Sequence, residues 1–245
     1  MLNNIINFVR GNWDLIKNIL IILLIAEVIN MFSRWLKETQ LAVRKEKFVL
    51  DNVKKGKQGE KLVAKELKSS KYENSYVFND VFLKEDDKII AQVDHILVSP
   101  KGIYVIETKN WQGMVENLDF NTIIRNNGKE YKTYKPTNQN RRHKIKLERL
   151  IDYKMVKDVV IFTKVKYMKP NDASEKMCNI DDFYRYYYKN AEDILTPDEV
   201  NYYVEKIKCV ISQNKKENNK YIENLKKQNK KDLKEIREMY KKDYA

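Results

Sequence analysis

Two extended apolar segments joined by a short turn most constrain the fold of this 245-residue chain. Residues 88–98 (KIIAQVDHILV) and 102–110 (GIYVIETKN) are rich in β-branched residues, and Ser99, Pro100 and Lys101 separate them. Extended apolar runs that flank a turn with Pro and Gly are typical of a β-hairpin. The sequence therefore predicts two neighbouring antiparallel strands of one sheet.

The segments on either side of this hairpin alternate between helical and extended patterns. Helical spacing of apolar residues predicts helices at 58–69 and 137–153. Further strands are predicted at 76–83 and 156–162. The resulting order, α-β-β-β-α-β, is typical of an α+β fold with a mixed central sheet and flanking helices.

Composition and charge divide the chain into five predicted regions. These are an N-terminal hydrophobic helix at 1–36, a basic linker helix at 37–56, a globular domain at 57–165, an extension with a helix at 166–212 and a charged helical tail at 213–245. The helix of the extension is predicted to start at Thr196, where a Thr-Pro-Asp-Glu sequence has the pattern of a capping box.

The hydrophobic helix predicts a membrane anchor. Residues 15–32 (LIKNILIILLIAEVINMF) lie between Trp13 and Trp35, and a span needs about 20 mostly apolar residues. Basic residues follow the run, so the positive-inside rule places the C-terminal bulk in the cytoplasm of a single-pass cell-membrane protein. Glu27 opposes a span, because a carboxylate in lipid is costly. The alternatives are an interfacial amphipathic helix and a self-associating helix, and the sequence is compatible with an oligomer.

The net charge and the small numbers of Cys and His limit the functions that the chain can have. With 48 Lys and Arg against 35 Asp and Glu, the net charge is +13, which attracts the phosphates of nucleic acid or an anionic membrane surface. Only two Cys and two His are present, which excludes a disulfide framework and a multi-histidine metal site. Any bound metal is therefore expected to have oxygen ligands, which favours Mg²⁺, Mn²⁺ or Ca²⁺.

Three ionisable residues interrupt the apolar hairpin. Asp94 lies in the first strand, and Glu107 and Lys109 share one face of the second, because strand side chains alternate. Such groups must compensate one another or hold a cation, because an unpaired buried carboxylate is costly. A buried ion pair that only shapes the sheet is the alternative.

The same spacing suits metal-assisted hydrolysis of a phosphodiester. Asp94 and Glu107 would supply oxygen ligands to Mg²⁺, and a backbone carbonyl near Thr108 and waters would complete the shell. The metal would polarise the phosphate and lower the pKa of a bound water. Lys109 would orient that water or offset charge in the transition state, and Glu60 would add a carboxylate from the opening helix.

Four separate blocks of the sequence resemble the nuclease-related domain family, NERD, which is grouped with the PD-(D/E)xK nuclease-like fold. The blocks are Gly59-Glu60, residues 92–96 (QVDHI), residues 102–109 (GIYVIETK) followed by Gly113, and Pro136-x-x-Gln139-x-x-x-His143. The resemblance covers residues 56–162 and implies a restriction-endonuclease-like, metal-dependent DNA-cleaving core. It implies catalytic positions at Asp94, Glu107 and Lys109, with Glu60 and Gln139 in support. Val93 stands where the broader motif has Pro.

A basic segment at residues 121–154 flanks Gln139. Backbone phosphates supply most non-specific affinity for DNA, and a basic surface near a carboxylate site suits a nuclease. The candidate nucleic-acid contacts are Arg125, Lys135, Arg141, Arg142 and Lys144. A solvated helix face is the alternative interpretation.

Three functions fit these observations. The first is a membrane-tethered nuclease that uses Mg²⁺ or Mn²⁺ to hydrolyse DNA phosphodiester bonds. The second is a non-catalytic nucleic-acid or partner-binding module that keeps the nuclease fold. The third is a membrane-surface scaffold whose basic residues contact anionic lipids. The intact acidic and lysine positions favour the first, because a binding module does not need them.

Overall fold

The computed structural model describes residues 11–119 and 121–228 of the chain. Contacts between Cα atoms divide the chain into two compact units, Met1–Lys54 and Lys55–Ala245. The second unit contains the sheet and all of the predicted site residues. Within the predicted tail, residues 215–228 are helical, and residues 229–245 lie outside the described part.

Helix α2 (Trp13–Leu67) combines the predicted hydrophobic helix, linker helix and opening helix of the domain in one element. Large apolar side chains near its start, such as Ile22 and Leu24, are exposed. Among the described residues, no helix has the length and apolar character that crossing a membrane requires. The predicted membrane span is therefore not supported, and Lys17 and Glu27 are charges that interrupt the apolar run.

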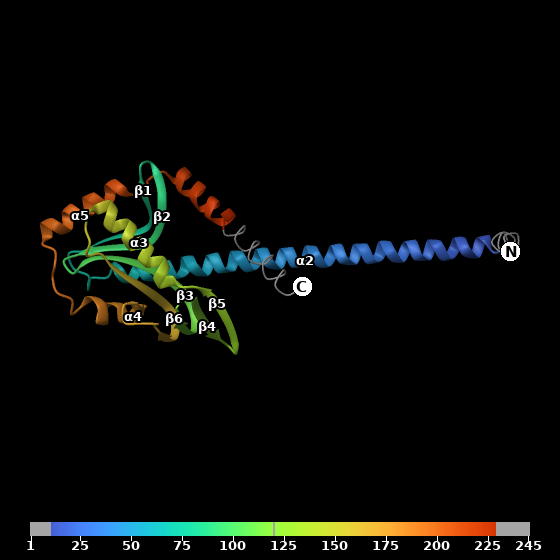
Figure 1. The fold of residues 1–245 in the computed structure, drawn as a ribbon, viewed down its shortest axis with the longest axis horizontal. Coiled ribbons are helices and arrows are strands. Elements are labelled where there is room, and N and C mark those ends of the chain that lie inside the picture. Colours follow the sequence, from blue (N-terminus) through green and yellow to red (C-terminus); the bar gives the residue numbers. More distant parts are fainter. Residues whose placement is uncertain (1–10, 120, 229–245) are drawn as a thin grey trace. The chain divides into compact units, whose positions relative to one another are not determined.

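Seven strands form one mixed sheet within the described residues (Figure 1). The strands are β1 (Tyr76–Glu85), β2 (Lys88–Ser99), β3 (Gly102–Asn117), β4 (Asn121–Asn126), β5 (Lys129–Tyr134), β6 (Lys157–Lys169) and β7 (Met177–Asn179). Strands β1 to β5 pair antiparallel in chain order. Strand β6 pairs parallel with β3, and β7 pairs parallel with β6. The predicted α+β fold with a mixed sheet is confirmed.

The hairpin of β4 and β5 was not predicted. It lies in the chain between β3 and α3 (Pro136–Ile151), where the sequence prediction has no element. Five of the six residues of β5 are exposed, so the strand lacks the alternation of apolar and polar residues that marks a half-buried strand. Strand β3 also extends beyond its predicted end, to Asn117.

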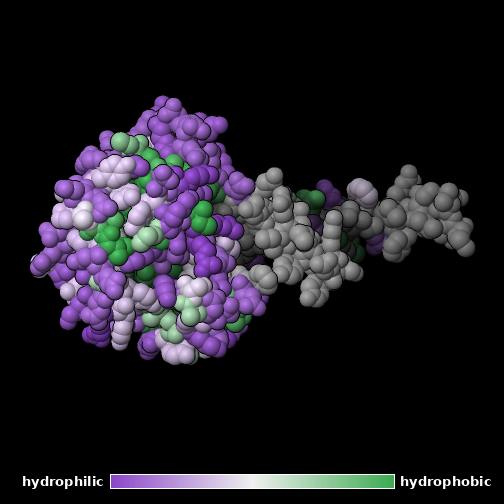
Figure 2. Space-filling model, turned by 60° about the vertical axis from the view of Figure 1, so that its left-hand side comes forward, coloured by the Kyte–Doolittle hydropathy of each residue, from purple (hydrophilic) through white to green (hydrophobic). Residues whose placement is uncertain are grey.

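Helices cover both faces of the sheet. Helices α3 and α5 (Pro197–Val210) pack on one face, where Leu147 and Val204 belong to the same core cluster as Val105 of β3. The end of α2, the short α4 (Ile180–Phe183) and the π-helix η1 (Tyr184–Tyr188) pack on the other. Helix α5 begins with the predicted capping box. The surface in Figure 2 is mainly hydrophilic, with small apolar areas between polar ones.

Asn140 fixes α3 to two strands at once. Its buried side-chain Nδ2 donates to the backbone oxygens of Val105 in β3 and Val159 in β6, each at 3.0 Å. No side chain caps the first turn of α3, so this amide and the packing of Leu147 hold the helix against the sheet. The position of the helix is therefore tied to the register of β3 and β6.

Gly113 allows β3 to bend past β4. Its φ is +95°, which favours glycine, and the pairing of β3 with β6 shifts register on both sides of it. A Cβ atom at Gly113 would lie 2.2 Å from the backbone oxygen of Arg125. Gly128, in the turn between β4 and β5, also has positive φ, but a Cβ there would meet nothing within 4 Å.

These two glycines give a matched prediction. Gly113→Ala is expected to lower the free energy of unfolding by roughly 2–5 kcal/mol, because it combines an unfavourable φ with a backbone clash. Gly128→Ala is expected to cost only about 1–2 kcal/mol, because it carries the φ penalty alone. Urea unfolding followed by circular dichroism measures both. Equal costs for the two variants would contradict the close approach of β4 to Gly113.

Candidate active site

The pairing of β2 with β3 brings Asp94 and Glu107 together. The last paired residues in this direction are His95 and Ile106, so Asp94 and Glu107 are the next residues opposite each other. The backbone N–H of Thr108 donates to Asp94 Oδ2 at 2.8 Å. Thr108 thus contacts Asp94 through its N–H group, whereas the prediction concerned a nearby carbonyl as a metal ligand.

Lys109 links the strands to helix α3. Its Nζ donates to Glu107 Oε1 at 2.5 Å and to Gln139 Oε1 at 3.4 Å. Glu107 and Lys109 therefore lie on one face of β3, as the period of two in a strand predicts. Asp94, Glu107, Lys109 and Gln139 are brought to one place, although they come from two strands and a helix.

Glu60 approaches the same place from α2. Gly59 permits this approach, because a Cβ atom there would lie only 2.8 Å from Asn110 Cβ of β3. The side chain of Asn110 also donates to the backbone oxygen of Lys55 in α2, at 2.7 Å. Burial raises the pKa of Glu60, and the carboxylate of Asp80 raises it further. The carboxylates of Glu60 and Asp80 therefore lie close enough to repel each other.

Asp80 is a neighbour of the site that the sequence analysis missed. It lies in β1 with a positive φ of 52°, and its Oδ1 accepts a hydrogen bond from Gln92 Nε2 at 2.7 Å. Gln92 is part of the QVDHI block, but its partner follows only from the pairing of β1 with β2. The signal available in the sequence was a carboxylate between the apolar residues Phe78 and Val81 of the predicted strand, next to Asn79.

The charges of the site do not balance. Burial raises the pKa of Asp94 well above its usual value, and the nearby Glu107 carboxylate raises it further. Burial alone would lower the pKa of Lys109, but the Glu107 and Asp94 carboxylates outweigh it and the pKa is raised. Two carboxylates thus share one ammonium in a mostly buried place. A proton or a cation would relieve the excess negative charge.

The carboxylate oxygens of Asp94 and Glu107 meet part of the coordination that a hard cation such as Mg²⁺ requires. Glu107 Oε2 is buried and accepts no hydrogen bond, and it would gain a partner if a cation bound there. Asp94 and Glu107 would bind a metal through carboxylate oxygens, which are the ligands that Mg²⁺ and Mn²⁺ prefer. Within the described ranges, no group of three or more His, Cys, Asp or Glu is arranged to hold a metal ion. Water and backbone oxygens would have to complete a shell around two carboxylates.

The two histidines have different environments. His143 of α3 places Nδ1 at 3.7 Å from Glu107 Oε2, so it adjoins the site, and burial lowers its pKa. His95 is buried, and its Nδ1 lies 2.7 Å from Asn79 Oδ1. Burial lowers the pKa of His95 to about 4. His143 is thus the histidine that belongs to the candidate site.

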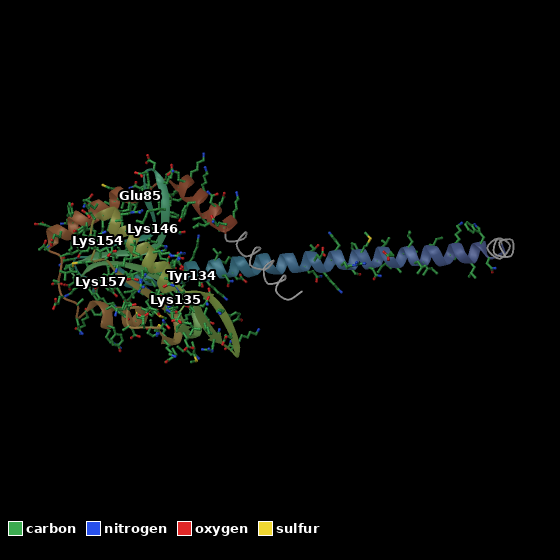
Figure 3. All side chains as sticks on the ribbon, in the orientation of Figure 1. Glu85, Tyr134, Lys135, Lys146, Lys154 and Lys157 are labelled. Carbon is green, nitrogen blue, oxygen red and sulfur yellow. The ribbon has the colours of Figure 1, made fainter. Side chains whose placement is uncertain are left out.

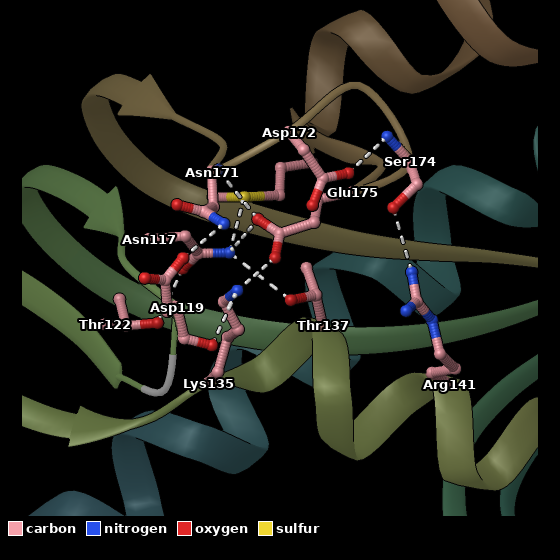
Figure 4. A network of polar contacts seen from close by, with 11 residues as sticks. Asn117, Asp119, Thr122, Lys135, Thr137, Arg141, Asn171, Asp172, Ser174 and Glu175 are labelled. Carbon is pink, nitrogen blue, oxygen red and sulfur yellow. Dashed lines mark hydrogen bonds and ion pairs between the residues drawn. The ribbon is translucent and has the colours of Figure 1, made fainter.

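Lys135 does not lie on the basic surface where it was predicted to bind nucleic acid. Its side chain is buried and forms an ion pair with Glu175 (Figure 4). Asn117 Nδ2 donates to the same carboxylate at 2.8 Å and to Thr137 Oγ1 at 3.3 Å. Lys135 is thus part of an internal polar network at the start of α3, and no phosphate can reach it in this conformation.

The other four predicted nucleic-acid contacts are on the surface but differ in their partners. Arg125 pairs with two glutamates of the sheet, and Lys144 lies within 4.0 Å of two carboxylates. Arg141 donates to Ser174 Oγ at 3.1 Å (Figure 4). The guanidinium carbon of Arg142 lies 5.5 Å from the ring centroid of Tyr134. Of the four, Arg141 and Arg142 have no carboxylate within 4.0 Å in the described part of the chain.

Comparison with known proteins supports the resemblance found in the sequence. Residues 55–163 match the family model described as a nuclease-related domain (NERD). An uncharacterized protein of Bacillus anthracis is 38% identical over 61 residues, which are 25% of this chain and 29% of that protein. The chain thus matches less than a third of the length of this relative. No solved structure matches the chain.

The raised pKa of Asp94 predicts a pH-dependent stability gain for Asp94→Asn. In the unfolded chain this carboxyl titrates near pH ~3.9, so wild-type stability falls as the pH rises from there toward the higher pKa of the folded state. Asn keeps an oxygen for the Thr108 N–H but does not ionise. With a metal chelator present, the variant is expected to melt above wild type at pH 7.

Thermal melting across a pH series measures this gain. The gap between Asp94→Asn and wild type should shrink as the pH falls, and its pH-dependent part should vanish below the unfolded pKa, because the Asp94 carboxyl of wild type is then protonated in both the folded and the unfolded state. Asp51→Asn, at an exposed residue of the other unit, is the control and should show no such trend. A gap that stays constant between pH 4 and pH 7 would rule out Asp94 as its source.

The buried Lys135–Glu175 pair predicts strong coupling between the effects of the two substitutions on the free energy of unfolding. Lys135→Met is expected to lower the free energy of unfolding by about 3–5 kcal/mol, because it leaves the Glu175 carboxylate buried without a cation. Lys135→Met combined with Glu175→Gln should recover most of the loss. Urea unfolding provides the measurement, and Arg125→Met, at an exposed ion pair, should have a much smaller effect. Strictly additive costs of the two changes would contradict a direct pair.

Proposed function

We propose that this chain, whose residues 55–163 match the nuclease-related domain family, is a metal-dependent nuclease that hydrolyses DNA phosphodiester bonds. One observation carries the proposal: Asp94, Glu107 and Lys109 converge on one face of β2 and β3, with more negative than positive charge. A sheet that needed only a stable core would place apolar side chains there, because uncompensated buried charge is costly.

Asp94 and Glu107 are the residues that would hold Mg²⁺ or Mn²⁺, through their carboxylate oxygens. When bound, the metal polarises the scissile phosphate and lowers the pKa of a coordinated water. Glu60 supports the site as a further, half-buried carboxylate, whose pKa is raised by burial first and then by the neighbouring Asp80 carboxylate. Protons compete for the same oxygens, so metal binding should strengthen as the pH rises.

Lys109 acts in its protonated form. Its raised pKa keeps the ammonium charged near neutral pH, so it donates hydrogen bonds to the attacking water or to an oxygen that gains negative charge. It does not act as a base under these conditions. Gln139 Oε1 and Glu107 Oε1 accept from Nζ and fix the direction of the ammonium group.

A non-catalytic nucleic-acid-binding module is the second candidate. The observation that favours it is the mutual compensation of Glu107 and Lys109, whose ion pair would also stabilise a fold without any metal. A module of this kind would bind DNA equally well with or without divalent metal. Measurements of cleavage and of metal binding separate the two candidates.

Cleavage of supercoiled plasmid in Mg²⁺ or Mn²⁺ tests the nuclease proposal. Wild type is expected to nick the plasmid, and Asp94→Ala and Lys109→Ala are expected to reduce the rate by a factor on the order of 10²–10³. The first variant would lose a carboxylate that holds the metal, and the second would lose the ammonium that stabilises developing negative charge. Lys68→Ala, at an exposed residue near the end of α2, should cleave like wild type. Equal rates for all four proteins would mean that the cleavage comes from a contaminant.

Metal binding is measured on the same proteins by thermal shift. Mg²⁺ or Mn²⁺ should raise the melting temperature of wild type, because a ligand that binds only the folded state stabilises it. The shift should be lost in Asp94→Asn. DNA binding with neither nicking nor a metal-induced shift would favour the non-catalytic module.

A further inference from the structure

One stripe of helix α3 carries both site residues and basic residues. Gln139, Arg142, His143 and Lys146 follow the spacing i, i+3, i+4 and i+7, which places them on one side of a helix. Gln139 accepts a hydrogen bond from Lys109, and His143 adjoins Glu107. Arg142 and Lys146 therefore lie along the edge of α3 that borders the candidate active site.

The basic residues of this edge are crowded and lack acidic partners. Lys146 is half-buried, and its Nζ donates to the backbone oxygen of Ile90 at 2.7 Å. Burial lowers its pKa, and the like charges of Arg142 and Arg149 lower it further. Arg149 is paired with Glu85. In the described ranges, neither Arg142 nor Lys146 has a carboxylate within 4.0 Å, so a bound anion would relieve their repulsion.

An exposed aromatic side chain stands at the start of the same edge. Tyr134 is the last residue of β5, 48% of its surface is exposed, and its ring contacts the guanidinium of Arg142. Figure 3 labels Tyr134 near the start of α3 and Lys146 farther along it. Aromatic rings beside a basic row are the combination that proteins use to bind single strands: the ring stacks on a base and the cations contact phosphates.

We propose that Tyr134, Arg142 and Lys146 form a binding track for one unpaired strand of nucleic acid beside Glu107 and Lys109. Arg142 and Lys146 contact successive parts of one sugar–phosphate backbone, because four residues of helix advance about 6 Å. Tyr134 stacks on an unpaired base. The inference deepens the proposed function, on which it rests, by naming its substrate class: nucleic acid with a single-stranded segment.

A single strand fits this edge better than a duplex. The bases of a duplex are stacked on one another and offer no free face to a tyrosine, whereas an unpaired base does. The two cations also lie in one row along one helix edge, which matches one backbone. Tyr131, the other exposed tyrosine of β5, lies outside the track and provides a matched control for the loss of an aromatic ring.

Fluorescence anisotropy with labelled oligonucleotides tests the track. The full chain is titrated in a metal chelator, so that binding is measured without cleavage, against single-stranded DNA, single-stranded RNA and a hairpin duplex. Tyr134→Ala is expected to weaken single-strand binding by roughly 5- to 150-fold, the range found when a stacking ring is removed. Duplex binding should stay within about twofold, because stacking is not available there. Tyr131→Ala should leave both unchanged.

Salt dependence tests the two cations. Arg142→Gln and Lys146→Gln should each reduce the slope of log affinity against log salt by about 1, because one phosphate contact is lost. Lys189→Gln, at a residue that follows η1 on the opposite face of the sheet, should keep the wild-type slope. Unchanged slopes in both variants overturn the track, and so does a Tyr134→Ala defect that is equal for single strands and duplex.

These experiments distinguish a failure of the binding track from a failure of the proposed nuclease activity. If the track variants lose binding but wild type never cleaves in metal, the track stands and the nuclease proposal fails. If wild type cleaves but the variants bind and melt like wild type, the nuclease proposal stands and the track is wrong. The relative affinities for DNA and RNA show which strand it accepts.

Discussion

The ion pair between Lys109 and Glu107 is the interaction on which the arrangement of the site depends. It allows two carboxylates, the half-buried Asp94 and the buried Glu107, to occupy adjacent positions on β2 and β3 with only one cation beside them. The same ammonium reaches Gln139 of α3, so the pair also connects the sheet to the helix above it. Stability and the proposed chemistry are opposed here, because the residual negative charge that weakens the fold would also favour the binding of a cation.

Local patterns made much of this structure predictable. The hairpin that contains Asp94 and Glu107 follows from two extended runs and one turn, and the period of a strand places Lys109 beside Glu107. The capping box of α5 also depends on only four neighbouring residues, starting at Thr196. In each case the partners lie close together in the chain, so one stretch of sequence contains the whole interaction.

Features that depend on distant partners could not be predicted. Lys135 lies in a basic segment, and only the folded chain brings it Glu175 from beyond β6. The side chain of Asp80 accepts a hydrogen bond from Gln92 on a neighbouring strand, and this partner is known only from the folded chain. Strand β5 is exposed almost throughout, so its sequence carries no periodic apolar signal. The apolar run at residues 15–32 showed the opposite problem, because a strong local pattern predicted a membrane span that the structure does not support.

Helix α3 links these features, since the Lys135 network holds its start and Asn140 bonds to β3 and β6. The helix cannot slide or rotate without breaking hydrogen bonds to both strands. Gln139 and His143 are thus held in place by the folded core, and the ordering entropy of these side chains is lost during folding and not at the moment of binding. A nucleic-acid strand that bound here, as proposed, would therefore meet a rigid helix edge, and any bending needed for the fit would have to come from the strand.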